Sequence, residues 1–519
     1  MKRRLGAAAL ALLVASSAPL ARAEDAGTGL GEGNDLAWME LLEAKIDDHL
    51  VADQVVELEY GTADHVPGDI VGVGGWGDSG LWTGTYLAAE SFRYATAKAK
   101  LEVIRGTQRR YWMEQRDEAL SRIERMVDKY DLLVNIAEGW RTETEVQQNP
   151  SEVSPIGFGG GVIQGERGML MRACAPVDSP PNLAMGDNKR VFGPFPWKGV
   201  DYKCETAPSR DTYAGTTFGL LAAYDLVGDD LGERKDMIRD DILNLASFLV
   251  KYGWNYPRPH GNVSVPNVQG GHDFDNFISP LFVYVPMARL NMAQAARHVA
   301  SGTDAQPVWD AVWAEELATQ LPLLAGSMEI DAVEPNAGYY KYNLHHLTGY
   351  SLVRLESDPA VKAQLLQALA VMDRTTGDDV NAHFETITFA LTGETSRRDA
   401  AIEHLRQWVD YRDNIVVDNR PGCGVDFECV ADDQKEIGDV VVPGTSTKQR
   451  ARRPLPVADR PPTDFLWQRP PTQLTGATSA THQAPGIDYL LPYWMLRYYT
   501  EVSVPAVSPF PAWPGPAHF

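Results

Sequence analysis

The feature that most constrains the fold of this 519-residue chain is a helical spacing of apolar residues that recurs along most of its length. Convincing strand patterns with a period of two are scarce, and this combination is typical of a helical protein. The spacing predicts twelve helices, at residues 36–54, 79–99, 111–136, 213–227, 233–252, 277–301, 306–325, 340–356, 359–374, 380–391, 396–411 and 486–500.

The predicted helices are of two kinds, which alternate along the chain. Odd-numbered helices, such as RYWMEQRDEALSRIERMVDKYDLLVNI, have one charged and one apolar face, as expected of a helix with one side in water. Even-numbered helices, such as DTYAGTTFGLLAAYDLV, carry few charges on any side and are expected to be buried. Six buried helices surrounded by six outer ones describe an all-α fold, an (α/α)6 toroid of six helical hairpins. An open helical solenoid or two bundles are alternatives that no strict repeat supports.

The first residues have the pattern of a secretory signal peptide. Basic residues at positions 2–4 precede an apolar stretch, and Ala21-Arg22-Ala23 matches a cleavage site. We therefore expect residues 1–23 to be removed and residues 24–519 to form a single toroid domain in an exported protein, periplasmic or secreted. No later segment offers about 18 uncharged apolar residues, so we expect no membrane insertion.

The charge of the chain limits its partners. The sequence has 47 Lys and Arg against 70 Asp and Glu, a formal net charge of −23. Removal of the signal peptide takes away four basic and no acidic residues, which changes this charge to −27. So acidic a protein repels polyanions on average, and we expect no nucleic-acid partner. Anionic polysaccharides are disfavoured by the same argument, but more weakly. The oligomeric state cannot be predicted.

Two long connections, 139–210 and 412–485, interrupt the helical pattern. Loops of this length in a compact domain are usually functional, or else contain small elements of their own. The four cysteines are even in number, which suggests two disulfides in an exported protein. Their order favours Cys174–Cys204 and Cys423–Cys429, one of three possible pairings, with one disulfide in each connection. We expect both connections to be ordered and to lie over one mouth of the toroid.

The starts of the even-numbered helices carry the candidate functional residues. In a ring of this kind the inner helices run in the same direction, so their first residues meet around one pocket. Tyr342, Asn343 and His346 also share a helical face. Helix N-caps are an alternative role for the acids, but they explain neither the aromatic residues nor the histidines. The residues at the helix starts are Asp78, Trp82 and Tyr86; Arg210, Asp211 and Tyr213; His272, Asp273, Asp275 and Asn276; Tyr342, Asn343 and His346; Asn381 and His383; and Asp488 and Tyr489.

The chain resembles a known superfamily in these segments. WTGTYLAAESFRYA, SRDTYAGTTFGLLAAYDLV and NLHHLTGYSLVRLE, which open predicted inner helices, are similar to the six-hairpin glycosidase superfamily, above all to its uncharacterised secreted bacterial members. The segment DFLWQRPP followed by PGIDYLLPYWMLRYY also looks like a family signature. The resemblance implies a carbohydrate pocket at the helix starts. No catalytic motif of a characterised family matches residue by residue.

The leading hypothesis is a glycoside hydrolase acting on a neutral or mildly charged glycan. This chemistry needs one carboxylic acid and one carboxylate. Asp211, beside Arg210, is the predicted carboxylate and Asp273 the predicted acid, with Asp78 and Asp488 as substitutes. Trp82 and Tyr86 could stack on a sugar ring. No metal or cofactor is expected.

Two other functions remain open. One is a polysaccharide lyase or epimerase acting on uronate glycans, in which Tyr342 or His346 moves the proton while Asn343, His383 and Arg210 hold the carboxylate. In this reading His272 and Asp488 also line the substrate pocket, as they do in the hydrolase. The other is a glycan-binding envelope protein without turnover, because a fold alone does not fix a function.

Overall fold

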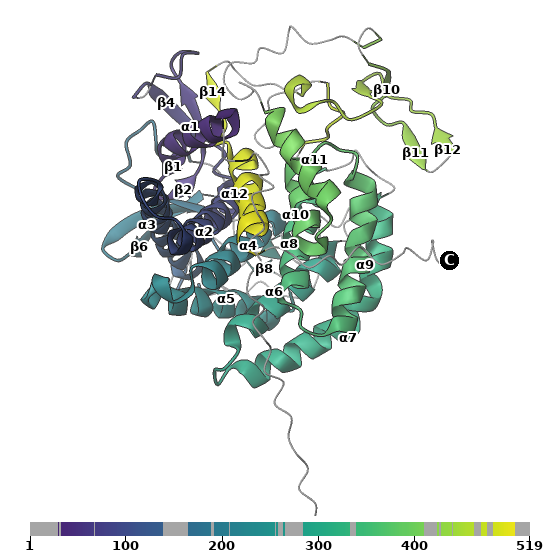
Figure 1. Ribbon diagram of the computed structural model, residues 1–519. Helices are drawn as coiled ribbons and strands as arrows, with labels where there is room; N and C mark the ends of the chain where they lie inside the picture. The colour runs from purple at the N-terminus through teal and green to yellow at the C-terminus, as the bar shows by residue number, and fades with distance from the viewer. Residues whose placement is uncertain are drawn as a thin grey trace, which may run out of the picture.

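The computed structural model describes residues 30, 33–66, 68–138, 165–187, 191–206, 208–254, 256–257, 263–264, 284–332, 339–408, 423–424, 427–437, 440–460, 469–474 and 481–503. Within these ranges the protein is mostly helical (Figure 1). The twelve helices found there are α1 (Gly33–His49), α2 (Ser79–Val103), α3 (Gln108–Asn135), α4 (Arg210–Leu226), α5 (Glu233–Lys251), α6 (Tyr284–Ala300), α7 (Gln306–Ala332), α8 (Tyr340–Leu355), α9 (Pro359–Thr376), α10 (Ala382–Thr392), α11 (Thr395–Arg406) and α12 (Ile487–Glu501).

Each predicted helix has a counterpart in the structure, and most boundaries agree within a few residues. Local signals explain several starts: Ser209 and Thr212 form a capping box on α4, and Asp358 caps α9 ahead of a proline at its first position. The largest described difference is at α7, which continues to Ala332 rather than ending at residue 325. Helix α1 ends at His49 rather than at residue 54. The chain turns there through Ala52 and Asp53, both with positive φ, into a two-residue hairpin.

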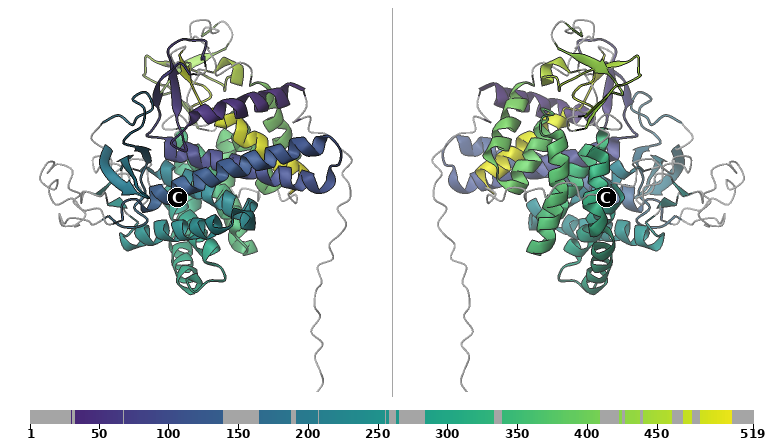
Figure 2. Two further views of the ribbon diagram at one scale, coloured as in Figure 1. Left: turned by 90° about the vertical axis from the view of Figure 1, so that its left-hand side faces the viewer. Right: turned by 90° about the vertical axis from the view of Figure 1, so that its right-hand side faces the viewer.

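The even-numbered helices contact one another in series. Helix α4 packs against α2 and α6, α8 against α6 and α10, and α12 against α10 and α2. The odd-numbered helices pack outside them, α3 against α2 and α5, α7 against α6 and α9, and α11 against α10 and α12. The side views in Figure 2 show α12 lying beside α2. Most of α2, α4, α8 and α12 is buried, whereas α3 and α5 bury one face.

Contacts along these helices fix their relative direction. A Cβ on Gly84 of α2 would lie 2.0 Å from the carbonyl oxygen of Gly215 of α4, so the two backbones touch near the start of both helices. Near the other end, Asp225 of α4 pairs with His298 of α6 at 2.7 Å and with Arg354 of α8 at 2.6 Å. These helices therefore run in the same direction.

The same holds for α10 and α12. The ring of Tyr339, which precedes α8, contacts that of Phe384 in the first turn of α10. Asn381 and Asp488, at the starts of α10 and α12, line one small cavity. We call the end at which the even-numbered helices begin the helix-start end.

The prediction of an all-α fold needs correction, because the described ranges also contain short strands. They form two three-stranded antiparallel sheets, β14–β3–β4 and β5–β7–β6, and four two-stranded ones. Strands of two to seven residues are too short for a period-two pattern to stand out. They are β1 (Leu50–Val51), β2 (Gln54–Val55), β3 (Glu57–Tyr60), β4 (Ile70–Gly74), β5 (Ala173–Pro176), β6 (Val191–Trp197), β7 (Val200–Glu205), β8 (Tyr256–Pro257), β9 (Val263–Ser264), β10 (Cys429–Ala431), β11 (Lys435–Ile437), β12 (Val440–Val442), β13 (Gln449–Ala451) and β14 (His482–Gln483).

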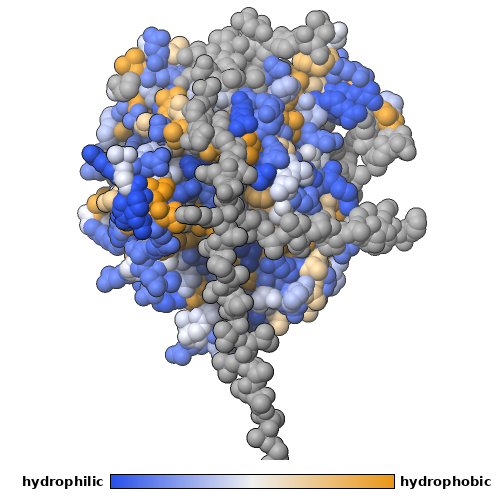
Figure 3. Space-filling model, in the orientation of Figure 1, coloured by the Kyte–Doolittle hydropathy of each residue, from blue (hydrophilic) through white to orange (hydrophobic). Residues whose placement is uncertain are grey.

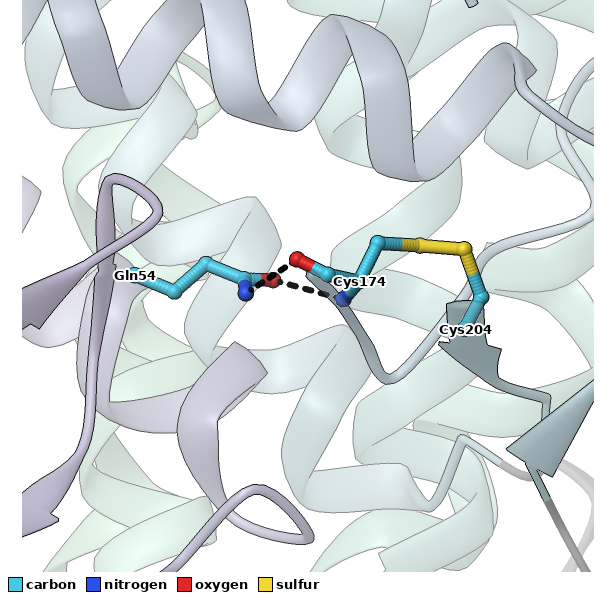
Figure 4. Close-up of a disulfide and its surroundings, with 3 residues drawn as sticks. All are labelled: Gln54, Cys174 and Cys204. Carbon is cyan, nitrogen blue, oxygen red and sulfur yellow. Dashed lines mark hydrogen bonds between the residues drawn. A yellow bond between two sulfur atoms is a disulfide. The ribbon is translucent and has the colours of Figure 1, made fainter. Parts of the chain in front are cut away.

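Both predicted disulfides are present, one in each long connection. Cys174 lies opposite Cys204 in the β5–β7 register, and Cys423 bonds to Cys429 six residues later. The side-chain amide of Gln54 makes two hydrogen bonds with the backbone of Cys174 (Figure 4). Its Nε2 donates to the Cys174 carbonyl oxygen, and its Oε1 accepts from the Cys174 backbone N–H. The first connection is thereby fixed to the chain segment that precedes α2.

The described surface is mixed in polarity. On the face shown in Figure 3 hydrophobic residues lie in small groups among hydrophilic ones, which is ordinary for a folded protein. None of the helices in the described ranges combines the length and the apolar character needed to cross a lipid bilayer.

Candidate functional site

Two of the predicted acids meet at the starts of α2 and α4. Arg172, just before β5, places Nη2 3.2 Å from Oδ1 of Asp78 and 4.0 Å from Oδ2 of Asp211. The three side chains keep 13%, 38% and 24% of their surface exposed in that order, so the group is open to solvent. Because both carboxylates touch one nitrogen, their nearest oxygens are at most roughly 7 Å apart. That limit admits the carboxyl spacings of both retaining and inverting glycosidases, about 5 and 6.5–9.5 Å.

Three of the predicted acids lie at or just after a helix N-cap. Asp78 is the N-cap residue of α2, but its side chain makes no capping hydrogen bond. Ser209 is the N-cap of α4 and Gly486 that of α12, so Asp211 and Asp488 lie inside the first turn. Capping by these side chains therefore does not account for their presence, although a carboxylate in a first turn still complements the helix dipole.

The sequence analysis predicted Arg210 as the partner of Asp211 and did not identify Arg172. Arg210 is the first residue of α4 and is almost fully buried. Arg172 is 39 positions upstream of Asp211 and reaches the helix starts because the amide of residue 172 bonds to the carbonyl oxygen of Glu205 beside the β5–β7 pair. A contact made through a three-stranded sheet leaves no local signal in the sequence.

A second group lies where α8 and α10 begin. His346 stacks on Phe384, with ring centroids 4.0 Å apart and planes 6° from parallel. Nδ1 of His346 donates to the carbonyl oxygen of Tyr342 at 2.7 Å, so its other nitrogen, Nε2, is left as an acceptor. Burial lowers the pKa of His346 to about 3 and holds the pKa of His383 well below its usual range, so both rings are neutral near pH 7.

Asn343, one position from Tyr342, is fully buried in this group. Neither its Nδ2 nor its Oδ1 has a hydrogen-bond partner among the described residues. An unpaired amide in a protein interior is costly, so such a residue requires an explanation. Tyr342 itself is buried with its ring against that of Tyr339, at a centroid distance of 5.3 Å.

The start of α12 adds a third group. Asp488 is almost fully buried and lines a cavity together with Asn381, His404 and Arg460, with room for about one water molecule. Asn381 caps α10 by accepting the amides of residues 383 and 384. Arg460 comes from the second long connection, so each connection supplies an arginine to the helix-start end.

The two aromatic residues of α2 are deeply buried. The indole of Trp82 packs against the backbone of Gly75, whose positive φ of 72° and missing Cβ make room for the ring. The hydroxyl of Tyr86 donates to Oε2 of Glu43 at 3.1 Å. Their predicted contact with a sugar stays a prediction.

Glu43 is the centre of a buried charge network that joins α1, α2, α3 and α12. Besides the Tyr86 hydroxyl it accepts Trp494 Nε1 at 2.9 Å, Arg93 Nη1 at 3.2 Å and Arg122 Nη1 at 2.7 Å. The network extends from the second to the fourth turn of α2, away from the helix start.

His272 and Asp273 lie outside the described residues, so their predicted roles stay predictions. Tyr213 is buried in the first turn of α4. Within the described ranges no group of three or more His, Cys, Asp and Glu residues is arranged to hold a metal ion.

Comparison of the chain with models of protein families, with curated proteins and with solved structures finds no match. The possible reactions are therefore inferred from the side chains at the helix-start end. Paired carboxylates beside a guanidinium suit acid–base or nucleophilic catalysis, and a neutral histidine with an unprotonated Nε2 suits proton abstraction.

Proposed function

We propose that the protein is an exported carbohydrate-active enzyme built on an (α/α)6 toroid, as the resemblance to six-hairpin glycosidases implies. The serial contacts of the even-numbered helices and their common direction support an inner ring. The two disulfides support an oxidising compartment, so the proposed location is the periplasm or the medium outside the cell.

The activity we propose is glycoside hydrolysis. The single observation that carries it is the pair of carboxylates, Asp78 and Asp211, on either side of Arg172 at the helix-start end. Asp211 acts as base or nucleophile, and Arg172 orients both carboxylates. The substrate is a neutral or mildly charged glycan, because the strongly negative net charge disfavours polyanions.

The test is an assay of purified mature protein on a panel of neutral and uronate-containing oligosaccharides. Reducing ends and the ultraviolet absorbance of unsaturated uronates are followed together. New reducing ends without absorbance are the expected result. Asp211→Asn should then lower kcat/KM by at least about 100-fold, and Asp78→Asn should also lower it. Asp229→Asn, which changes an exposed acid beyond the far end of α4, is the matched control.

Full activity in folded Asp78→Asn and Asp211→Asn variants would contradict the proposed site. No turnover on any sugar, together with thermal stabilisation by one of them, would instead support a glycan-binding protein.

A second candidate, a lyase or epimerase, is favoured by one observation. His346 is neutral and has no hydrogen bond on Nε2 among the described residues, so it can accept a proton. Rising absorbance together with new reducing ends would select the lyase, and His346→Gln should then abolish the absorbance signal. The net charge of the chain places this candidate second.

A further inference from the structure

The carboxyl group of Asp211 and the group around His346 lie on helices that contact each other directly. The ring of Phe218 on α4 packs against that of Tyr350 on α8, with centroids 5.7 Å apart and planes at 69°. Farther from the helix starts, Asp225 of α4 pairs with Arg354 of α8 at 2.6 Å. Helices α4 and α8 are therefore parallel neighbours along this interface, and the ring contact fixes which faces they turn to each other.

Asp211 of α4 and Asn343 of α8 lie on these facing sides, at one level. Asp211 precedes Phe218 by seven positions, and Asn343 precedes Tyr350 by seven. Seven residues are two turns to within about 20°, so each pair shares a helical face and is separated by about 10 Å along the axis. Since packed helix axes are about 8–10 Å apart, Asn343 is within reach of a sugar ring that contacts Asp211.

Asn343 differs from the other amide side chains that the structure describes. It alone has both its nitrogen and its oxygen buried without a hydrogen bond, whereas Asn291 on α6 leaves only its oxygen unpaired. His346 shares the helical face of Asn343 and keeps 4% of its surface exposed. Its Nδ1 donates to the backbone, so Nε2 is an acceptor. The interior beside Asp211 therefore offers one N–H donor and two acceptors.

These groups suit sugar hydroxyls better than a carboxylate. Two adjacent hydroxyls of a sugar ring match one side-chain amide, because one hydroxyl accepts from Nδ2 while its neighbour donates to Oδ1. A carboxylate only accepts, so it would leave Oδ1 of Asn343 and Nε2 of His346 unpaired. In the described ranges, moreover, neither side chain hydrogen-bonds to a cation that could offset the charge of a carboxylate.

We infer that Asn343 and His346 form a sugar-binding subsite beside Asp211 and bind neighbouring hydroxyl groups of a neutral sugar. This inference rests on the proposed hydrolase and names its substrate class, a glycan with free hydroxyls on adjacent carbons of the sugar bound there. Asn343 is fully buried, so the sugar reaches it after a side chain that covers it rotates, a change that is common on binding. The bound hydroxyls then supply the hydrogen bonds that the amide lacks.

The test combines stability with activity. Asn343→Leu removes the amide and keeps a similar shape. Because the amide makes no hydrogen bond within the described chain, the variant should raise the melting temperature. It should lower kcat/KM by about 10- to 100-fold on a glycan that the wild type cleaves, because two hydrogen bonds to the sugar are lost.

Asn291→Leu is the matched control, because Asn291 is a buried amide at a deeper level of the helices. It precedes His298 by seven positions, as Phe218 precedes Asp225, and His298 pairs with Asp225 at 2.7 Å. Asn291 therefore lies at the level of Phe218, about 10 Å deeper than Asp211. Asn291→Leu should leave kcat/KM unchanged.

Monodeoxy analogues of the cleaved glycan identify the hydroxyls that are bound. On an analogue that lacks a hydroxyl bound by Asn343, Asn343→Leu should cost less than about 3-fold in kcat/KM, whereas on the other analogues the full loss should remain. His346→Phe keeps a ring to stack on Phe384 but removes the acceptor. It should lower kcat/KM by about 10-fold with the same products, and it provides an independent test if Asn343→Leu does not fold.

A lower melting temperature or an unchanged kcat/KM for Asn343→Leu would overturn the inference and leave the hydrolase intact. Equal losses on every deoxy analogue, or cleavage confined to uronate sugars, would do the same. A wild type that cleaves no glycan would overturn the hydrolase, and this inference with it.

Discussion

The buried network around Glu43 allows a prediction whose size follows from the structure. Glu43→Gln keeps the volume of the side chain but removes its charge. Four donors converge on the two oxygens of Glu43, from Tyr86, Trp494, Arg93 and Arg122. A glutamine offers one oxygen and turns an NH2 group toward the remaining donors.

The expected cost is large because two arginines lose a carboxylate that solvent cannot replace. Arg93 and Arg122 are then left with Glu90 as their fully buried counter-ion, at 3.1 and 3.7 Å. Breaking a buried ion pair by removing one partner typically costs about 3 to 5 kcal/mol. We expect Glu43→Gln to lower the free energy of unfolding by this amount.

The assay is urea denaturation followed by far-ultraviolet circular dichroism and by tryptophan fluorescence, with coincident curves as the check on two-state unfolding. Glu118→Gln is the matched control, because Glu118 pairs with the same Arg93 at 2.8 Å but is 57% exposed. It should cost less than about 1 kcal/mol. Equal costs for the two variants, or a cost below about 1 kcal/mol for Glu43→Gln, would refute the reasoning.

The network also predicts a pH dependence. Burial, and then the charge of Glu43, raises the pKa of Glu90 from 4.5 to about 7. Between these values the unfolded chain has released a proton that the folded protein retains, so this group lowers stability as the pH rises from 4.5 to 7, by about 3 kcal/mol. Glu90→Gln should remove that fall, and an unchanged pH profile of the unfolding free energy would show that Glu90 titrates normally.

Three further predictions concern other parts of the molecule. Replacing Cys174 and Cys204 by alanine opens a 30-residue loop and should lower the free energy of unfolding by about 3–4 kcal/mol. Replacing Cys423 and Cys429 opens a six-residue loop and should lower it by about 2 kcal/mol. Urea denaturation of the two double variants measures both differences. Gly84→Ala forces α2 away from α4 and should cost about 1–3 kcal/mol in the same assay, whereas Gly186→Ala, with open space around it, should cost almost nothing. Val380→Gly relieves a positive φ, so it should keep or raise the melting temperature; a lower melting temperature would mean that Val380 is not strained.

The sequence predicted the helices well because each helix is long enough for its apolar spacing to repeat several times. Helix α4, for example, carries few charges on any side, which predicted a buried helix, and its Gly215 indeed touches α2. The cysteine pairs were predicted because they are close in the sequence. The strands were missed because each has only two to seven residues, and their pairing depends on partners such as β3 and β14 that are far apart in the chain.

The candidate site was predicted less completely, because its arginines come from segments that have no periodic sequence pattern. Asp78 and Asp211 stand at helix starts, where a local pattern exposes them. Arg172 and Arg460 reach the same end from the long connections, where no periodicity marks them.

The origin of these arginines in the long connections also affects how stable the candidate site is. The helices supply the carboxylates and the histidines, while the connections supply arginines that lie beside them. The disulfide at Cys174 is two residues from Arg172, and Gln54 holds it against the segment before α2. Arg460 contacts the backbone of Asp379, next to the strained Val380. The helices could therefore remain folded after the connections are loosened, but Asp78 and Asp211 would then lose their common counter-ion. We therefore expect reduction of the first disulfide to lower activity before it lowers the helix content.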